Sequence, residues 1–165
     1  MLAVAVARWN SFFMAEVGAA AALAGLLFVA ISINIGEILQ DSYLPMRAGQ
    51  TIGILIASLV EASLVLIPEQ SVRALGAEVL MTGALMCVLS ALVLWRSHGW
   101  LESLPREWQA SRVLLWVGGT ILPPVAGVVL VAGASWGLYV LAAAILVAFL
   151  VAALNAWVFL VEILR

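Results

Sequence analysis

Residues 11–36 read SFFMAEVGAAAALAGLLFVAISINIG, and this stretch decides the fold. It is long and apolar enough to cross a bilayer as a helix, since a crossing needs about 20 apolar residues. Counting from Ser11 by fours and threes, seven of eight residues are small and share one helical stripe: Ser11, Ala15, Gly18, Ala22, Gly25, Val29, Ser32 and Gly36. Small residues let a second helix approach closely in lipid. We therefore expect a helix-packing seam with Gly18, Ala22 and Gly25 at its middle.

The opposite face of the same helix is polar at its ends and apolar between them. Glu16, Leu23, Leu27 and Asn34 lie nearly in line there at helical spacing. Neither face suits lipid alone, so we expect this helix at the centre of a bundle.

The composition places the protein in a membrane. Of its 165 residues, 66% are hydrophobic and 10% are charged, whereas soluble domains carry about 25% charged residues. The chain has no lysine and a net charge of −2, which excludes the basic surface of a nucleic-acid-binding protein. Its single Cys87 forms no disulfide within the chain and is expected to be buried and inert.

Five segments are long enough to span a bilayer, and together they predict one all-α, polytopic membrane domain over residues 1–165. They cover residues 12–39, 48–67, 71–95, 113–132 and 136–164. A short interfacial helix is expected in the loop 96–112, where tryptophans share one face. The alternative is four spans, with one pair merged or re-entrant.

Arginine counts predict the orientation, because cytoplasmic loops carry an excess of positive charge. Two arginines lie on the N-terminal side and five on the other. The sequence therefore predicts a multi-pass protein of the bacterial inner membrane, with its N-terminus outside and its C-terminus in the cytoplasm.

Three carboxyl groups are expected at similar depth near the outer side. Glu61 and Glu78 flank the Pro68 turn at similar distances, and Glu16 lies near the outer end of the first span. Ionisable groups inside a membrane are costly and indicate function. We interpret them as a proton- or cation-binding cluster; the alternative is that each is protonated or pairs with an arginine or a hydroxyl group.

Toward the cytoplasmic side a second polar layer contains Asn34, Glu37, Asn155 and Glu162. Asn155 is suited to hydrogen bonding across helices. Glu37 and Glu162 are placed to form interfacial ion pairs with Arg47 and Arg165.

Two further patterns concern helix packing. Gly49, Gly53 and Ala57 form a run of small residues at spacing four, which indicates close packing of the second span. In the fourth span, Pro123 and Pro124 remove backbone donors and predict a kink.

The sequence offers no set of catalytic or metal-binding residues. His98 is the only histidine and has no second histidine or cysteine beside it. Gly118–Gly119 lacks the lysine and preceding strand of a phosphate loop. We therefore expect no enzyme, no cofactor and no metal.

Residues 18–34 and 155–165 resemble a family of small bacterial membrane proteins without an assigned function. The resemblance implies a membrane bundle but no activity. The first stretch is also similar to the pore helix of Orai calcium channels, but the Orai pore glutamate falls on Ile33 here, and that function is not carried over.

Two functions fit these patterns. The first is a homo-oligomeric cation or proton conduit lined by the first helix, with Glu16 at the outer mouth, Leu23 and Leu27 as a dry constriction and Asn34 inside. The second is a non-catalytic accessory subunit that packs against a larger membrane protein.

Overall fold

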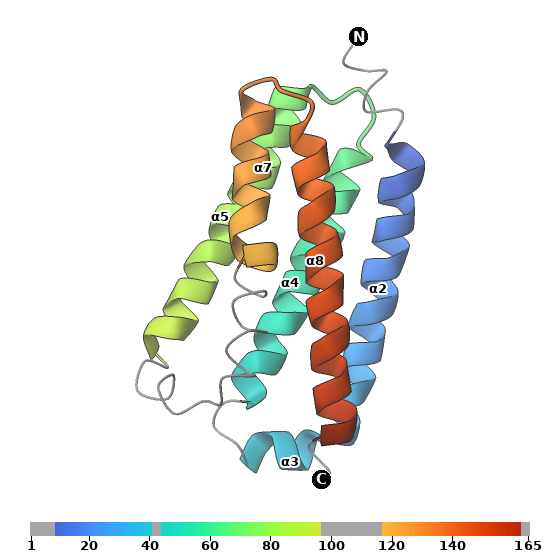
Figure 1. Ribbon diagram of the computed structural model, residues 1–165, viewed down its shortest axis with the longest axis vertical. Helices are drawn as coiled ribbons and strands as arrows, with labels where there is room; N and C mark the ends of the chain where they lie inside the picture. The colour runs from blue at the N-terminus through green and yellow to red at the C-terminus, as the bar shows by residue number, and fades with distance from the viewer. Residues whose placement is uncertain (1–8, 41–43, 97–116, 163–165) are drawn as a thin grey trace.

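The computed structural model describes residues 9–40, 44–96 and 117–162, and every regular element in these ranges is helical (Figure 1). The elements are α2 (Asn10–Ile33), α3 (Ile35–Gln40), α4 (Leu44–Val65), α5 (Val72–Arg96), η2 (Val117–Ile121), α7 (Leu122–Val131), α8 (Gly137–Trp157) and η3 (Val158–Glu162). The two η elements are π-helical turns.

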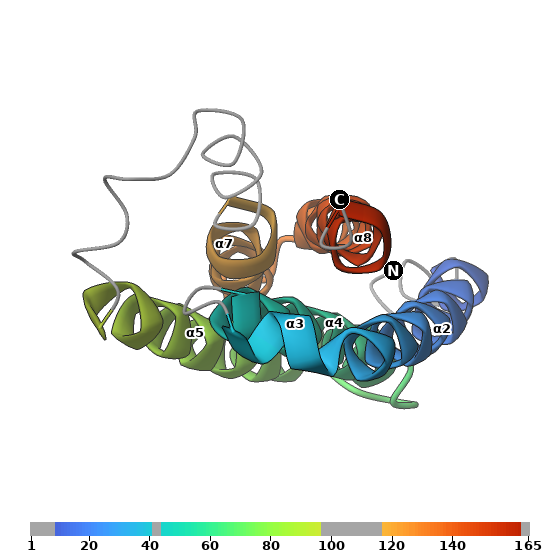
Figure 2. The ribbon, with the colours of Figure 1, turned by 90° about the horizontal axis from the view of Figure 1, so that it is seen from below.

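The helices form two layers. Figure 2 shows α2, α4 and α5 side by side in one layer, with α7 and α8 covering one face of it. The turns at Pro68 and at Gly133 both lie at the end of the bundle where α2 begins (Figure 1). Gly133 has φ 83°, a left-handed conformation that glycine adopts without strain. Tight turns at this one end make α4–α5 and α7–α8 antiparallel hairpins.

Four helices are long and apolar enough to cross a membrane: Asn10–Ile33, Leu44–Val65, Val72–Val93 and Gly137–Val161. The prediction of a helical membrane protein is thus confirmed at this coarser level. The described part of the predicted fourth span is the shorter apolar helix Gly119–Val131, so the count of five is not confirmed. The predicted interfacial helix at 96–112 lies outside the described residues.

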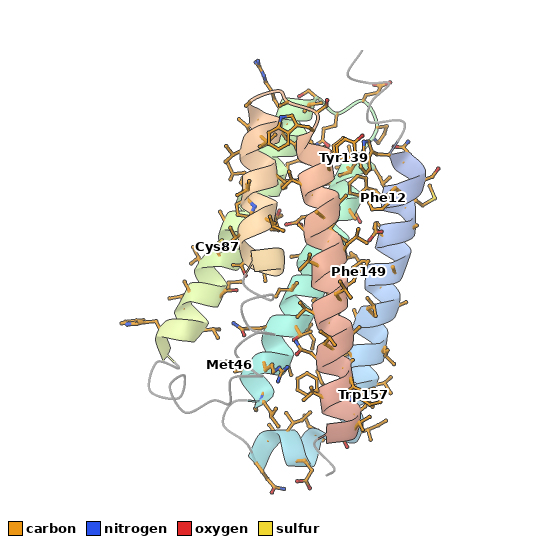
Figure 3. All side chains as sticks on the ribbon, viewed as in Figure 1. Phe12, Met46, Cys87, Tyr139, Phe149 and Trp157 are labelled. Atoms are coloured by element: carbon orange, nitrogen blue, oxygen red, sulfur yellow. The ribbon has the colours of Figure 1, made fainter. Side chains whose placement is uncertain are left out.

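Aromatic side chains at the two ends of the bundle fit this assignment. Tyr139 and Trp157 lie at opposite ends of α8 (Figure 3) and are 67% and 60% exposed. The Trp9 ring lies 4.7 Å from that of Tyr139. Aromatic rings at both ends of a span are typical of membrane interfaces.

The expected central position of the first helix is wrong. In the apolar windows of the spanning helices, 50% of α8 and 44% of α4 is buried, against 22% of α2. Figure 2 places α2 at the edge of its layer. The central helix is α4, which lies between α2 and α5 and is covered on one face by the second layer, α7 and α8. The predicted span 12–39 also breaks at Asn34, which ends α2 before the short α3.

The predicted seam faces outward. A Cβ added to Gly18, Gly25 or Gly49 would meet nothing within 4 Å, and Ala22 is exposed. Gly53 would meet only the Met86 methyl group, at 3.3 Å. Within the described part of the chain, Gly18, Gly25 and Gly49 therefore make no close contact with another helix, and the predicted packing seam stays a prediction.

A different set of glycines makes the closest helix contact, between α5 and α7. A Cβ at Gly83 would lie 2.7 Å from the Pro124 nitrogen, and one at Gly127 would lie 2.6 Å from the Leu80 nitrogen. Gly76 contacts the end of α7 in the same way. No other residue fits these positions without moving a backbone, so these glycines fix α7 on α5.

Candidate functional site

A stripe of buried polar side chains follows one face of the central helix α4. Arg47, Thr51, Ser58 and Glu61 recur at helical spacing, and none is more than 4% exposed. The face lies against the second layer, since Arg47 and Thr51 contact α8. Polar groups buried in a membrane protein mark functional sites by default.

Arg47 and Asn155 form the best-bonded part of this stripe. Nε and Nη2 of Arg47 donate to Asn155 Oδ1 at 2.9 and 2.5 Å. Asn155 Nδ2 donates to Thr51 Oγ1 at 2.8 Å, and the Thr51 hydroxyl donates to the Arg47 carbonyl at 2.8 Å. Every polar atom of the Asn155 side chain is therefore used, and α4 is tied to α8.

Arg47 does not lie in a loop, as the sequence analysis assumed. The second helix begins at Leu44, about one turn earlier than predicted, and so carries Arg47 inside the bundle. Asn155 supplies an acceptor for the buried guanidinium group.

Asn34 extends this layer to α2. Its side chain is buried, and Nδ2 donates to the Phe159 carbonyl of η3 at 2.5 Å. We call Asn34, Arg47, Thr51 and Asn155 the arginine layer. Glu37 is exposed, and among the described residues it makes no ion pair with Arg47. The side chain of Glu162 and the whole of Arg165 lie outside the described part.

Glu61 lies at the other end of the stripe, and its side chain has one weak hydrogen-bond partner in the part of the chain that the structure describes. Thr82 Oγ1 lies 3.4 Å from Glu61 Oε1, and also 3.0 and 3.1 Å from the carbonyl oxygens of Val79 and Glu78. A hydroxyl group donates one proton, so three acceptors compete for it. The Glu61 carboxyl is thus fully buried but poorly bonded.

Glu16 has a buried oxygen without a partner. Its side chain is 7% exposed, and no group in the described residues hydrogen-bonds to Oε2. Phe13, about one turn earlier, packs in a core cluster with Ala62 and Val65 of the antiparallel helix α4. Glu16 and Glu61 therefore lie at the same level of the bundle.

Glu78 is half-buried and accepts a hydrogen bond from Gln70 Nε2. We call Glu16, Glu61 and Glu78 the carboxyl layer. Within the ranges that the structure describes, no three His, Cys, Asp or Glu side chains are grouped closely enough to hold a metal ion. The three carboxyl groups therefore lie near one level but not around a common centre.

An apolar region separates the two layers. Leu27 is 1% exposed and packs with Leu55, Ala152 and other residues of α2, α4 and α8, and the half-buried Leu23 borders the same cluster. The two leucines proposed as a constriction thus lie in the core of one chain. Ile54 of α4 packs in a separate cluster with Ala148 and Val151 of α8.

The predictions from the sequence do not include Arg47, Thr51 and Ser58 as members of one stripe, nor Thr82 as a partner of Glu61. A signal for the stripe exists, because positions 47, 51, 58 and 61 share one helical face. The predicted span 48–67 begins after Arg47 and so leaves it out of the pattern.

Comparison of the chain with protein-family models, curated proteins and solved structures finds no match. The resemblance of residues 18–34 and 155–165 to a family of small membrane proteins stays a prediction. Any function has to come from the two polar layers and the surface of α2.

Proposed function

We propose that this protein conducts protons across the membrane, with Glu16 and Glu61 as its proton-binding groups. The observation that carries the proposal is the buried Glu16 Oε2, which has no partner among the described residues, at the level of the buried Glu61 carboxyl. A carboxyl group buried in a bilayer is stable only when it is protonated, or when its negative charge is paired with a positive charge. An under-bonded carboxyl group is therefore suited to taking up and releasing a proton.

Protons are favoured over metal cations by the spacing of the carboxyl groups. A metal ion requires several oxygen ligands at once, and the described residues offer no such group. A proton requires one oxygen, and a hydroxyl group such as that of Ser58 on the same helix face relays it.

The proposed path runs along α4 rather than along α2 alone. Glu16, Leu27 and Asn34 are buried on the side of α2 that packs against α4 and α8, and Leu27 contacts the same core cluster as Leu55 of α4. The path therefore lies within one chain, and a homo-oligomer is not required to form it.

The test is proton flux into vesicles containing the purified protein, driven by a potassium diffusion potential and followed with a pH-sensitive dye. We expect flux for the natural chain and a severalfold loss in Glu16→Gln and Glu61→Gln. Glu69→Gln is the matched control, because Glu69 lies exposed in the Pro68 turn. The proposal is wrong if no variant exceeds protein-free vesicles, or if both buried substitutions leave the flux unchanged.

A second function, that of an accessory subunit, is favoured by the outward seam on α2. Gly18, Ala22 and Gly25 leave open space on the outer face of an edge helix. In lipid, such a face suits close contact with a helix of another membrane protein or of a second copy.

This alternative is tested by crosslinking in membranes and by stoichiometry in mild detergent. Gly25→Leu is expected to abolish a complex with another protein while the isolated chain stays folded. Ala143→Leu enlarges an exposed residue of α8 and serves as the control. A complex with a larger protein supports the accessory role, and a chain that crosslinks to no other protein contradicts it.

The proposed topology has five crossings in a bacterial inner membrane, with the N-terminus outside. The fourth is formed by residues 113–132, of which η2 and α7 are the described part. The arginine asymmetry of the sequence supports this orientation. Reporter fusions at the Pro68 turn and at the C-terminus test it: opposite sides are expected, and equal sides contradict five crossings.

A further inference from the structure

Ile54 occupies the middle of the α4 stripe, between the polar residues Thr51 and Ser58. Its side chain is 4% exposed and packs with Ala148 and Val151 of α8. Ile54 is thus an apolar residue within the otherwise polar face of α4, and it lies between the carboxyl layer and the arginine layer.

The backbone of η2 rests directly on Ile54. A Cβ at Gly119 would lie 2.7–2.9 Å from three side-chain atoms of Ile54, so only glycine allows this contact. Ile54 is thus held between α8 and η2.

The hydrogen bonding of η2 is weakened by the two prolines that follow it. The Gly119 carbonyl has no backbone donor four or five residues ahead, because Pro123 and Pro124 have no N–H. The Thr120 carbonyl lacks the α-helical donor at Pro124, and it accepts a hydrogen bond from the Cys87 thiol of α5 at 2.8 Å. Figure 3 places Cys87 on α5 beside α7. Single π-turns in such positions are frequent at functional sites.

We propose that Ile54 is a hydrophobic gate between the two polar layers, and that η2, held by the Cys87–Thr120 hydrogen bond, keeps it closed. The gate rests on the proposed proton conduction, since it regulates the same path. Rearrangement of η2 withdraws Gly119 from Ile54 and gives the isoleucine room to leave the stripe. Dry constrictions of this kind gate by excluding water.

The experiment is the vesicle flux assay with Ile54→Ala. We expect proton flux to rise about tenfold, which corresponds to a barrier lower by about 1.4 kcal/mol. Ile56→Ala is the matched control, because Ile56 is 50% exposed on the outer face of the same helix. The double variant Ile54→Ala, Glu61→Gln is expected to lose the gain, which excludes a leak through misfolded protein.

The outcomes separate the gate from the conduction. Flux that depends on Glu61 but is equal in Ile54→Ala and the natural chain overturns the gate alone. No flux in any variant overturns the conduction, and the gate with it. A second pair tests η2: Cys87→Ala removes the donor to Thr120 and is expected to raise flux, whereas Cys87→Ser keeps a donor and stays near the natural value. Equal flux in both overturns the role of η2.

Discussion

The two polar layers of the bundle differ in how completely their groups are bonded. In the arginine layer, Arg47, Thr51 and Asn155 satisfy one another, and Asn34 binds a carbonyl of η3. In the carboxyl layer, Glu16 has an oxygen without a partner in ranges 9–40, 44–96 and 117–162, and within the same ranges Glu61 has one long contact, to Thr82. A hydrogen-bond network in which every buried polar group has a partner stabilises the structure. A buried polar group without a partner lowers stability, and proteins keep such groups at functional sites. The arginine layer therefore holds the helices, and the carboxyl layer is where chemistry is expected.

The largest effect is expected from Asn155→Leu. The substitution removes both hydrogen bonds that Arg47 makes to Asn155, and the free energy of unfolding should fall by about 3 kcal/mol. Denaturation in mixed detergent micelles, followed by circular dichroism, measures it. The double variant Arg47→Met, Asn155→Leu also removes the buried charge and should recover most of the loss. A single variant as stable as the natural chain would remove the structural role of this layer.

The opposite sign is expected from Glu16→Leu. Removing a buried acceptor that has no partner should stabilise the protein by about 1–2 kcal/mol, while proton flux is lost. The same denaturation and flux measurements apply. A destabilised Glu16→Leu variant would mean that Glu16 is bonded in the membrane, and the contrast between the layers would then disappear.

The difference between the layers also explains what the sequence could predict. Apolar length and composition are read residue by residue, so a helical membrane protein followed directly from them. The break at Asn34 could not be predicted in this way, because the Asn34 side chain hydrogen-bonds to the carbonyl of Phe159, which lies 125 residues away. Partners at that separation leave no periodic signal.

Glycine patterns likewise do not predict which helix faces pack together. The stripe on α2 is regular, yet it faces outward, whereas Gly83 and Gly127 make the tight contact between α5 and α7. Spacing indicates that a close approach is permitted, but the partner decides which face is used. Arg47 was misplaced for a similar reason, since a charge is assigned to a loop unless its buried partner is known.

A smaller effect is expected from Thr51→Val. The Asn155 amide loses its acceptor, so the free energy of unfolding should fall by about 1 kcal/mol, the usual value of an interhelical hydrogen bond in lipid. Proton flux should stay near that of the natural chain once the amount of folded protein is equalised. Loss of flux without loss of stability would move the site of conduction into the arginine layer.

The smallest change in stability is expected from Thr82→Val, which is the matching substitution in the carboxyl layer. The lost contact to Glu61 is 3.4 Å long and the hydroxyl is shared with two carbonyl oxygens, so unfolding should change by less than about 0.5 kcal/mol. Flux should nevertheless fall, because the hydroxyl orients the carboxyl group that carries the proton. Thr82→Ser keeps the hydroxyl and should restore the flux. The two substitutions are thus expected to act in opposite ways. Thr51→Val should lower the free energy of unfolding and leave proton flux nearly unchanged, whereas Thr82→Val should lower proton flux and leave the free energy of unfolding nearly unchanged. If both variants behave in the same way, the two layers do not differ in function.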